Sequence, residues 1–175
     1  DRESVEGILN KINIKIIYQD NSQRIFLNNE DVSEKIRTQE VARGASAVAT
    51  IQAVRIKMVE LQRKMAEDTS VVMDGRDIGT VVFPNSEMKL FLTSSPEIRA
   101  KRRFDEMVAK GESPLYEDVL ANVKERDLRD TTREVSPLKK ADDAIVLDNS
   151  EVGIEEQLQW ALDMFNKITG NNERN

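Results

Sequence analysis

Short apolar runs alternate with longer stretches of helical periodicity along most of the chain. The runs at 71–73, 90–92 and 144–147 are continuous rather than alternating, as is typical of strands buried on both faces. One stretch between them carries a clear helical stripe, which consists of Ile51, Val54, Met58, Leu61 and Met65. Strands separated by helices predict an α/β fold, with a parallel sheet covered by helices on both faces.

Residues that favour helix starts and stops predict where the helices begin and end. A helix is predicted from near Thr38, with Gly44 interrupting an early piece. Ser95 followed by Pro96 predicts a helix that runs to about Lys110 and stops at Gly111. Ser113-Pro114 predicts another start, for a helix that reaches about Arg133. The last helix is expected to turn a set of apolar residues inward and to be followed by a frayed polar end at 170–175. That set is Ile154, Leu158, Leu162 (or Ala161), Phe165 and Ile168.

The first part of the chain has a different pattern. Residues 4–11 are typical of the tail of a helix, and apolar and polar residues then alternate over 12–17 as in a half-buried strand. The turn-forming residues 20–22 precede a second short strand at 24–27, and 28–31 turns again. This pattern predicts a small hairpin-based antiparallel insert.

Composition narrows the classes of protein. The chain has 175 residues with 33% charged side chains and a net charge of −6, which favours one folded domain and disfavours a general nucleic-acid binder. No apolar run is long enough to span a membrane. The absence of Cys and His excludes thiolate and imidazole chemistry, and it fits a reducing, cytoplasmic location.

The strongest candidate site is the loop Asp74-Gly75-Arg76-Asp77-Ile78-Gly79-Thr80, directly after the run at 71–73. Arg76 is suited to grip a phosphate, and an Asp can accept a hydrogen bond from an exocyclic amine. The alternative is an ordinary loop with an internal Asp–Arg pair.

Three further groups carry candidate chemistry. Arg126, Asp130 and Arg133 share one face of a helix, although such faces are often only solvated ion-pair ladders. The basic stretch 99–103 could clamp a polyphosphate or could be an exposed helix face balanced by neighbouring acids. Ser46 and Arg55 lie on the first long helical stretch. This inventory suits phosphoryl transfer, and it equally suits phosphate recognition without catalysis.

Several stretches resemble the bacterial cytidylate kinases, which are nucleoside monophosphate kinases. The residues 72–84, the stretch 24–38, the helix segment 125–133 with 135–139, and 143–148 follow the family pattern in order. The resemblance covers about residues 1–168. It implies a P-loop NTPase-like parallel sheet, with 12–38 as an insert on the monophosphate side and about 97–112 as a short lid.

The resemblance also implies a reaction and a set of roles. The family transfers a phosphoryl group from ATP to CMP or dCMP with Mg²⁺. Arg133, Arg126, Arg102 and Arg103 would be catalytic, and no residue would be a metal ligand. The acceptor nucleotide would be bound by Ser46, Arg55, Arg76, Asp77, Arg126, Asp130 and Arg133. The ATP phosphates would be bound by Lys101, Arg102 and Arg103.

One departure from the family is evident. The sequence contains no G-x-x-x-x-G-K-[ST] phosphate loop. We therefore expect residues 1–175 to be an N-terminally truncated cytidylate kinase domain that lacks the first strands and is inactive alone, and otherwise a monomer unless the missing piece is supplied in trans. The alternatives are a CMP-binding fragment without catalysis and a kinase for another monophosphate, such as UMP.

Overall fold

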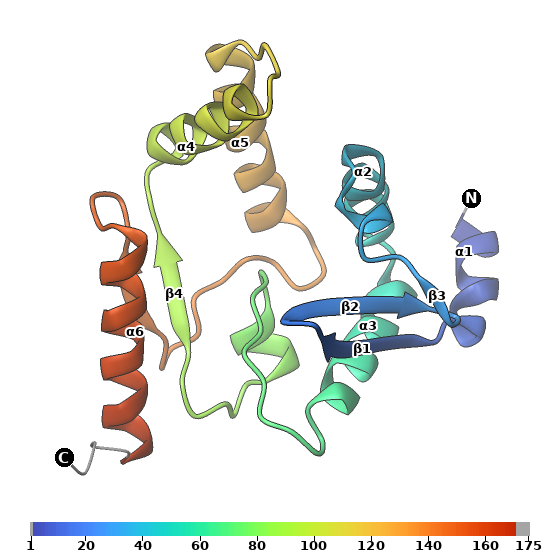
Figure 1. The fold of residues 1–175 in the computed structure, drawn as a ribbon. Helices are drawn as coiled ribbons and strands as arrows, with labels where there is room; N and C mark the ends of the chain where they lie inside the picture. Colours follow the sequence, from blue (N-terminus) through green and yellow to red (C-terminus); the bar gives the residue numbers. More distant parts are fainter. Residues whose placement is uncertain (1, 171–175) are drawn as a thin grey trace. The chain divides into compact units, whose positions relative to one another are not determined.

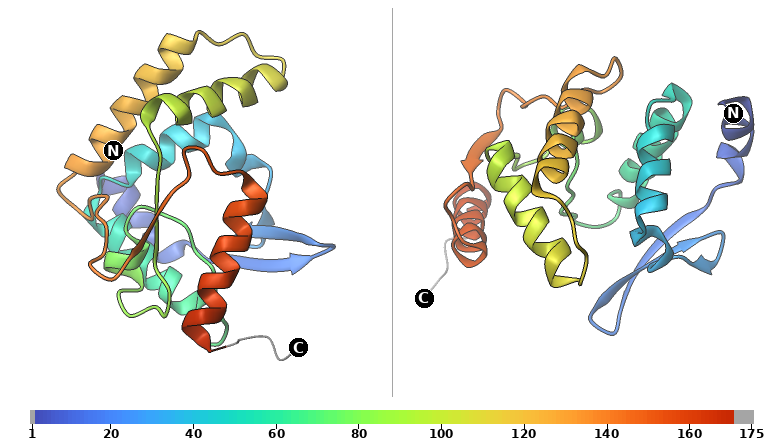
Figure 2. Two further views of the ribbon diagram at one scale, coloured as in Figure 1. Left: turned by 90° about the vertical axis from the view of Figure 1, so that its left-hand side faces the viewer. Right: turned by 90° about the horizontal axis from the view of Figure 1, so that it is seen from above.

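Two units make up the computed structural model, which describes residues 2–170; the units are Asp1–Val72 and Met73–Asn175. Each has its own sheet, with three antiparallel strands in the first unit and two parallel strands in the second (Figures 1 and 2). The predicted α/β class is therefore confirmed. Of the predicted frayed end at 170–175, residues 171–175 lie outside the described residues.

The first unit opens with helix α1 (Arg2–Ile8) and a 3₁₀ turn, η1 (Leu9–Lys11). Strands β1 (Ile14–Gln19) and β2 (Ser22–Leu27) then form the predicted hairpin. Asp20 and Asn21 both have positive φ angles, which suits the two-residue turn between strands that twist right-handedly. The structure adds a strand at 28–31, where only a turn was predicted: β3 (Glu30–Asp31) pairs with β2.

Two helices follow the insert. After the 3₁₀ turn η2 (Lys35–Arg37), Thr38 caps α2 (Gln39–Val48) by accepting a hydrogen bond from the Val41 amide. The prediction that Gly44 interrupts this stretch is wrong, because α2 passes through Gly44 and the chain breaks at 49–51, before α3 (Gln52–Met65). A glycine inside a helix lowers stability by less than about 1 kcal/mol relative to alanine, and the neighbouring helical hydrogen bonds offset this loss.

The second unit is built on two parallel strands, β4 (Leu90–Thr93) and β5 (Ile145–Asp148), paired in register from Leu90↔Ile145 to Thr93↔Asp148. At their amino ends the buried Lys89 ammonium pairs with the Asp143 carboxylate. The prediction of a buried strand at 71–73 is wrong for the described residues. Val71 and Val72 are exposed, and no described strand pairs with them.

Three helices complete this unit. Ser95 caps α4 (Pro96–Ala109) as predicted, and Gly111 follows it with a left-handed φ of 81°. Helix α5 (Tyr116–Thr132) begins after the predicted Ser113-Pro114 signal, with Leu115 at its N-cap and no side-chain cap. Helices α4 and α5 lie side by side (Figure 2). The last helix is α6 (Ile154–Thr169).

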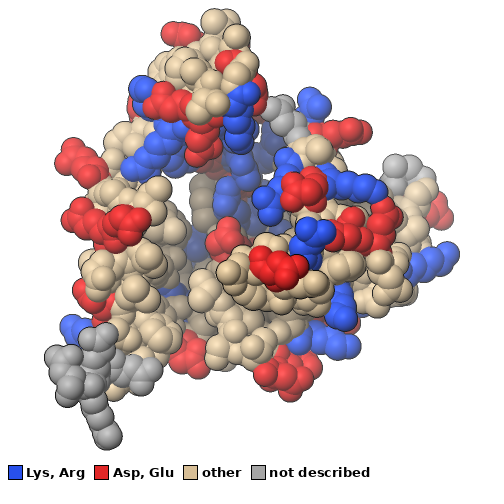
Figure 3. All heavy atoms as spheres, in the orientation of Figure 1, with Lys and Arg blue, Asp and Glu red and all other residues tan. Residues whose placement is uncertain are grey.

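The prediction that the apolar stripe of α6 is buried is wrong. Ile154 is 82% exposed and Leu158 55%, and Leu162, Phe165 and Ile168 are also exposed. With β4 and β5, the helix lines a shallow groove of about 290 Å³, whose walls are Leu90, Leu92, Leu147, Ile154, Gln157, Leu158 and Ala161. Two four-residue strands are too small a surface to cover sixteen helical residues. On the face drawn in Figure 3, charged side chains of both signs alternate with broad uncharged areas.

None of the helices described is both long and apolar enough to cross a lipid bilayer.

Candidate nucleotide site

The loop after residue 73 places Arg76 and Asp77 in different surroundings. Arg76 is exposed, whereas Asp77 is 7% exposed and its carbonyl oxygen accepts the amides of residues 80–82 at the start of η3 (Ile78–Val82), a single π-helical turn. A Cβ at Gly75 would lie 2.8 Å from Cγ1 of Ile78, so any larger residue here must displace the Ile78 side chain. The backbone of this loop thus buries Asp77 and leaves the guanidinium of Arg76 at the surface.

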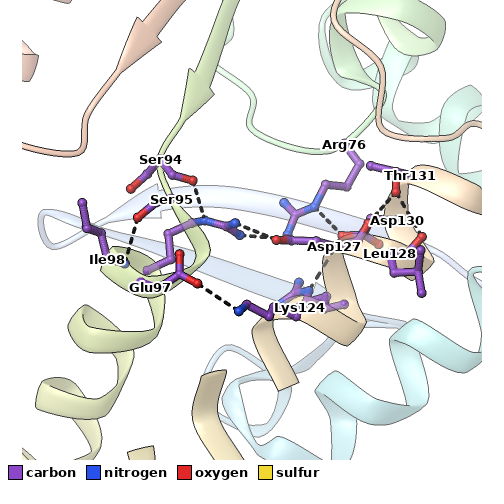
Figure 4. Close-up of polar contacts among 12 residues, drawn as sticks. Arg76, Ser94, Ser95, Glu97, Ile98, Lys124, Asp127, Leu128, Asp130 and Thr131 are labelled. Carbon is purple, nitrogen blue, oxygen red and sulfur yellow. Dashed lines mark hydrogen bonds and ion pairs between the residues drawn. The ribbon is translucent and has the colours of Figure 1, made fainter. Parts of the chain in front are cut away.

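Arg76 finds its partner on α5 rather than within its own loop. Its Nε donates to Oδ2 of Asp130 over 2.7 Å, across 54 residues of sequence (Figure 4). Nε of Arg126 lies 3.9 Å from the same oxygen, one helical turn away. Asp130 is therefore the shared anion between two guanidiniums, and the alternative of a pair internal to the loop is not what the structure contains.

A second ion pair beside this one was not predicted. On α4, Nη1 and Nη2 of Arg99 donate to the two carboxylate oxygens of Asp127 over 2.7 and 2.6 Å. The hydrogen bond from Arg99 holds the pKa of Asp127 below its ordinary value, and the charges of Arg99, Arg76 and Arg126 act in the same direction. The spacing of Asp127 and Asp130, three residues apart on one helix, was the available signal.

Arg133 ends the helix that carries these acids. It is the C-cap residue of α5, and its Nε donates to the carbonyl of Ser136 over 2.6 Å. Ser136 has a positive φ of 51°, so the chain turns sharply here. The bond holds the guanidinium against this turn, close in sequence to Asp130.

The three basic side chains at 101–103 of α4 lie in three different surroundings. Nζ of Lys101 pairs with Asp105 and lies 5.9 Å from the centre of the Phe104 ring. Arg102 donates to the carbonyls of Asn149 and Ser150, in the loop after β5. Arg103 is exposed. For Lys101 the structure matches the alternative of an exposed face balanced by neighbouring acids.

Ser46 and Arg55 belong to the first unit. Ser46 is an exposed residue of α2, and Arg55 is a half-buried residue of α3. The structure thus brings together Arg76, Arg126 and Asp130 in the second unit, with Arg133 on the same helix, and it carries Ser46 and Arg55 in the other unit.

The described residues provide anion-binding groups rather than a metal cage. Three guanidiniums, of Arg76, Arg99 and Arg126, surround two carboxylates, of Asp127 and Asp130, which leaves one positive charge in excess. Within residues 2–170, no three acidic side chains converge to hold a metal ion. Mg²⁺ in proteins commonly takes most of its ligands from nucleotide phosphates and water, so it does not require such a cluster.

A guanidinium-rich cluster beside the carboxyl end of a parallel strand is typical of α/β proteins that bind phosphate-bearing small molecules. Comparison with known proteins narrows this class: the family model described as "Cytidylate kinase" matches residues 1–167. The chain belongs to the cytidylate kinase family.

Individual relatives agree with this assignment. A protein named cytidylate kinase from Parabacteroides distasonis is 55% identical over 145 residues, which are 83% of this chain and 63% of that protein. One of the same name from Caldicellulosiruptor bescii is 48% identical over 171 residues, covering 98% of this chain and 76% of that protein. The matches with these relatives and with that from Bacteroides thetaiotaomicron span 62–76% of the relatives' own lengths.

Proposed function

We propose that this chain carries the acceptor-nucleotide site of a cytidylate kinase, which transfers a phosphoryl group from ATP to CMP or dCMP and yields ADP and CDP or dCDP. The observation that carries the proposal is the family match over residues 1–167, because it includes every residue of the cluster around Asp130. The excess of guanidinium groups supports it, since phosphoryl transfer depends on positioning and neutralising negative charge.

On the acceptor side, each side chain has one proposed role. Asp77 accepts a hydrogen bond from the cytosine amino group, and its burial favours a specific contact over general attraction. Arg76 and Arg55 hold the phosphate of CMP. Arg126 and Asp130 bind the pentose, and Ser46 contacts the nucleoside. Because Arg76 already bonds to Asp130, these two can meet neighbouring parts of one nucleotide.

On the donor side, Arg133 would face the transferring phosphoryl group, with Arg126, Arg102 and Arg103 as further catalytic cations. Lys101, Arg102 and Arg103 would bind the ATP phosphates. Arg102 must then exchange its bonds to the carbonyls of Asn149 and Ser150 for bonds to phosphate. Mg²⁺ would arrive with ATP and neutralise phosphate charge.

The proposal extends to the larger organisation. The sheet belongs to a P-loop NTPase-like fold, residues 12–38 form the insert on the CMP side, and about 97–112 form the lid. The chain would act in the cytoplasm as a monomer, unless the segment with the phosphate loop is supplied in trans. Its 175 residues contain no phosphate loop, so they do not turn over ATP by themselves.

Two measurements on the 175-residue chain test the proposal. CMP should raise the thermal midpoint more than UMP or AMP at equal concentration, and a coupled assay for ADP with CMP and ATP should show no turnover. Stabilisation by all three nucleotides alike would favour another monophosphate kinase. Turnover would overturn the inactivity of the chain, and no stabilisation by any of them would overturn the CMP site itself.

Asp77 provides the sharper test of substrate choice. Asp77→Ala should reduce the preference for CMP over UMP by about tenfold or more, because the lost acceptor matches an amino group that uracil lacks. Asp74→Ala changes an exposed acid of the same loop and serves as the control, with an unchanged ratio. If the ratio of the two dissociation constants is the same in Asp77→Ala as in the unaltered chain, Asp77 does not read the base.

A further inference from the structure

We propose that Arg99 and Asp127 are positioning residues, whose ion pair holds α5 so that Asp130 stays against Arg76. The inference rests on the proposed function, in which Asp130 and Arg76 contact CMP. Neither Arg99 nor Asp127 is assigned a contact with the nucleotide.

Arg99 connects the end of the sheet to α5. Its Nε donates to the carbonyl of Ser94, the first residue after β4, over 3.2 Å. The two Nη atoms take both oxygens of Asp127. Arg99 therefore uses Nε and both Nη atoms to fix a point on α5 relative to the end of β4. Its two partners, Ser94 and Asp127, are labelled in Figure 4.

Among the contacts described between α4 and α5, this ion pair lies nearest to Asp130. Tyr116 meets Phe104 and Glu97 near the start of α5, and Lys124 pairs with Glu97 over 2.9 Å. Asp127 is only three residues before Asp130, about 4.5 Å along the helix axis, whereas Lys124 is about 9 Å away. A tilt of α5 about its early contacts would displace Asp130 unless Asp127 were held.

The two acids of α5, Asp127 and Asp130, have different arginine partners. Both carboxylate oxygens of Asp127 accept hydrogen bonds from Arg99 in a bidentate ion pair. A lysine cannot reproduce this geometry. Asp130, 16% exposed at its side chain, remains available to Arg76 and Arg126. Removing the charge of Asp127 would loosen α5 and leave Arg99 without its carboxylate partner.

The first arm of the test needs no nucleotide. The nuclear magnetic resonance signal of the Arg76 Nε–Hε group reports its bond to Asp130, and we expect Asp127→Asn to move it towards the position of an arginine with no carboxylate partner. Glu97→Gln is the matched control, because it removes the other ion pair between the same helices, and it should leave the signal in place. An unchanged Arg76 signal in Asp127→Asn would overturn the inference whether or not CMP binds.

The second arm measures CMP affinity by calorimetry. Asp127→Asn should raise the dissociation constant about tenfold, since small misplacements of a binding group are costly. In an Asp130→Ala background the same change should have no further effect. A purely structural role would instead weaken binding equally in both backgrounds, and that result would overturn the inference.

Failure of this inference and failure of the proposed function give different results. If the unaltered chain does not bind CMP, the proposed function fails, and the Arg76 signal still decides the positioning role. If Asp127→Asn does not fold, Arg99→Lys takes its place, with the same expected movement of the Arg76 signal and the same tenfold loss.

Discussion

Asp31 shows how single side chains hold the small antiparallel sheet together. Its Oδ1 accepts hydrogen bonds from the amide and the hydroxyl of Ser33, over 3.0 and 2.6 Å, and its Oδ2 accepts one from Nε of Arg24. Ser33 is itself buried, and its oxygen accepts the amide of Ile25. Chiefly because of the Ser33 hydroxyl, the pKa of Asp31 falls from 3.8 to about 2.

This lowered pKa predicts a pH dependence of stability. A carboxyl group with a lower pKa in the folded state stabilises that state above its unfolded pKa, and it loses the contribution as the pH falls through the folded value. The difference in thermal midpoint between the unaltered chain and Asp31→Asn should therefore be constant above about pH 5 and shrink towards pH 2. Asp20→Asn, in the turn of the same hairpin, is the control, and a difference that persists at pH 2 would contradict the expectation.

At the scale of elements, two glycines have opposite surroundings. Gly44 lies inside α2, where an added Cβ would meet no atom within 4 Å. Gly75 lies in the loop before η3, where an added Cβ would press on the side chain of Ile78 at 2.8 Å. The helix can therefore take an added side chain without rearrangement, whereas the loop can take one only if Ile78 moves.

Alanine at these two positions should shift stability in opposite directions. Gly44→Ala should raise the free energy of unfolding by about 0.5–1 kcal/mol, because alanine loses less backbone entropy on folding than glycine. Gly75→Ala should lower it by about 1–3 kcal/mol, since Ile78 must leave its position. Urea unfolding of the two variants measures both values, and a destabilised Gly44→Ala would show that α2 cannot tolerate the added methyl group.

At the scale of the whole molecule, few apolar residues are buried, and the apolar side chains of α6 are exposed. Val82 is 1% exposed, whereas Leu92, Ile154 and Leu158 along the groove are each more than half exposed. Apolar surface left in contact with water contributes nothing to folding, so these groove residues add little stability in the chain as described.

Substitution of the groove residues should therefore be tolerated. The double variant Ile154→Gln with Leu158→Gln should bind less of a fluorescent hydrophobic dye and change the free energy of unfolding by no more than about 0.5 kcal/mol. Val82→Ala is the contrasting variant, with an expected loss of about 2 kcal/mol. A loss of similar size in the double variant would show that the α6 face is covered in solution.

Local chemistry accounts for what could be predicted from the sequence. Ser95 and Pro96 start α4, Thr38 caps α2, and the pair Asp20-Asn21 turns the first hairpin, because each acts on backbone groups within a few residues. The continuous apolar runs at 90–92 and 144–147 predicted β4 and β5, although their pairing joins residues more than 50 positions apart. The loop 74–80 stays a predicted site, which its own residue types suggested.

Long-range pairing explains what could not be predicted. Arg76 bonds to Asp130, and Arg99 takes Asp127, 28 residues away on another helix. The apolar residues at 71–73 and on α6 are buried only where another helix or strand packs against them. That helix or strand comes from a distant part of the sequence, so burial cannot be predicted from the local pattern. The amino-acid sequence by itself determined most helix starts, the first hairpin and the residue types of the candidate site, because propensity and capping are local. Tertiary structure decided partners, burial and the fate of the run at 71–73, because these depend on contacts between distant residues.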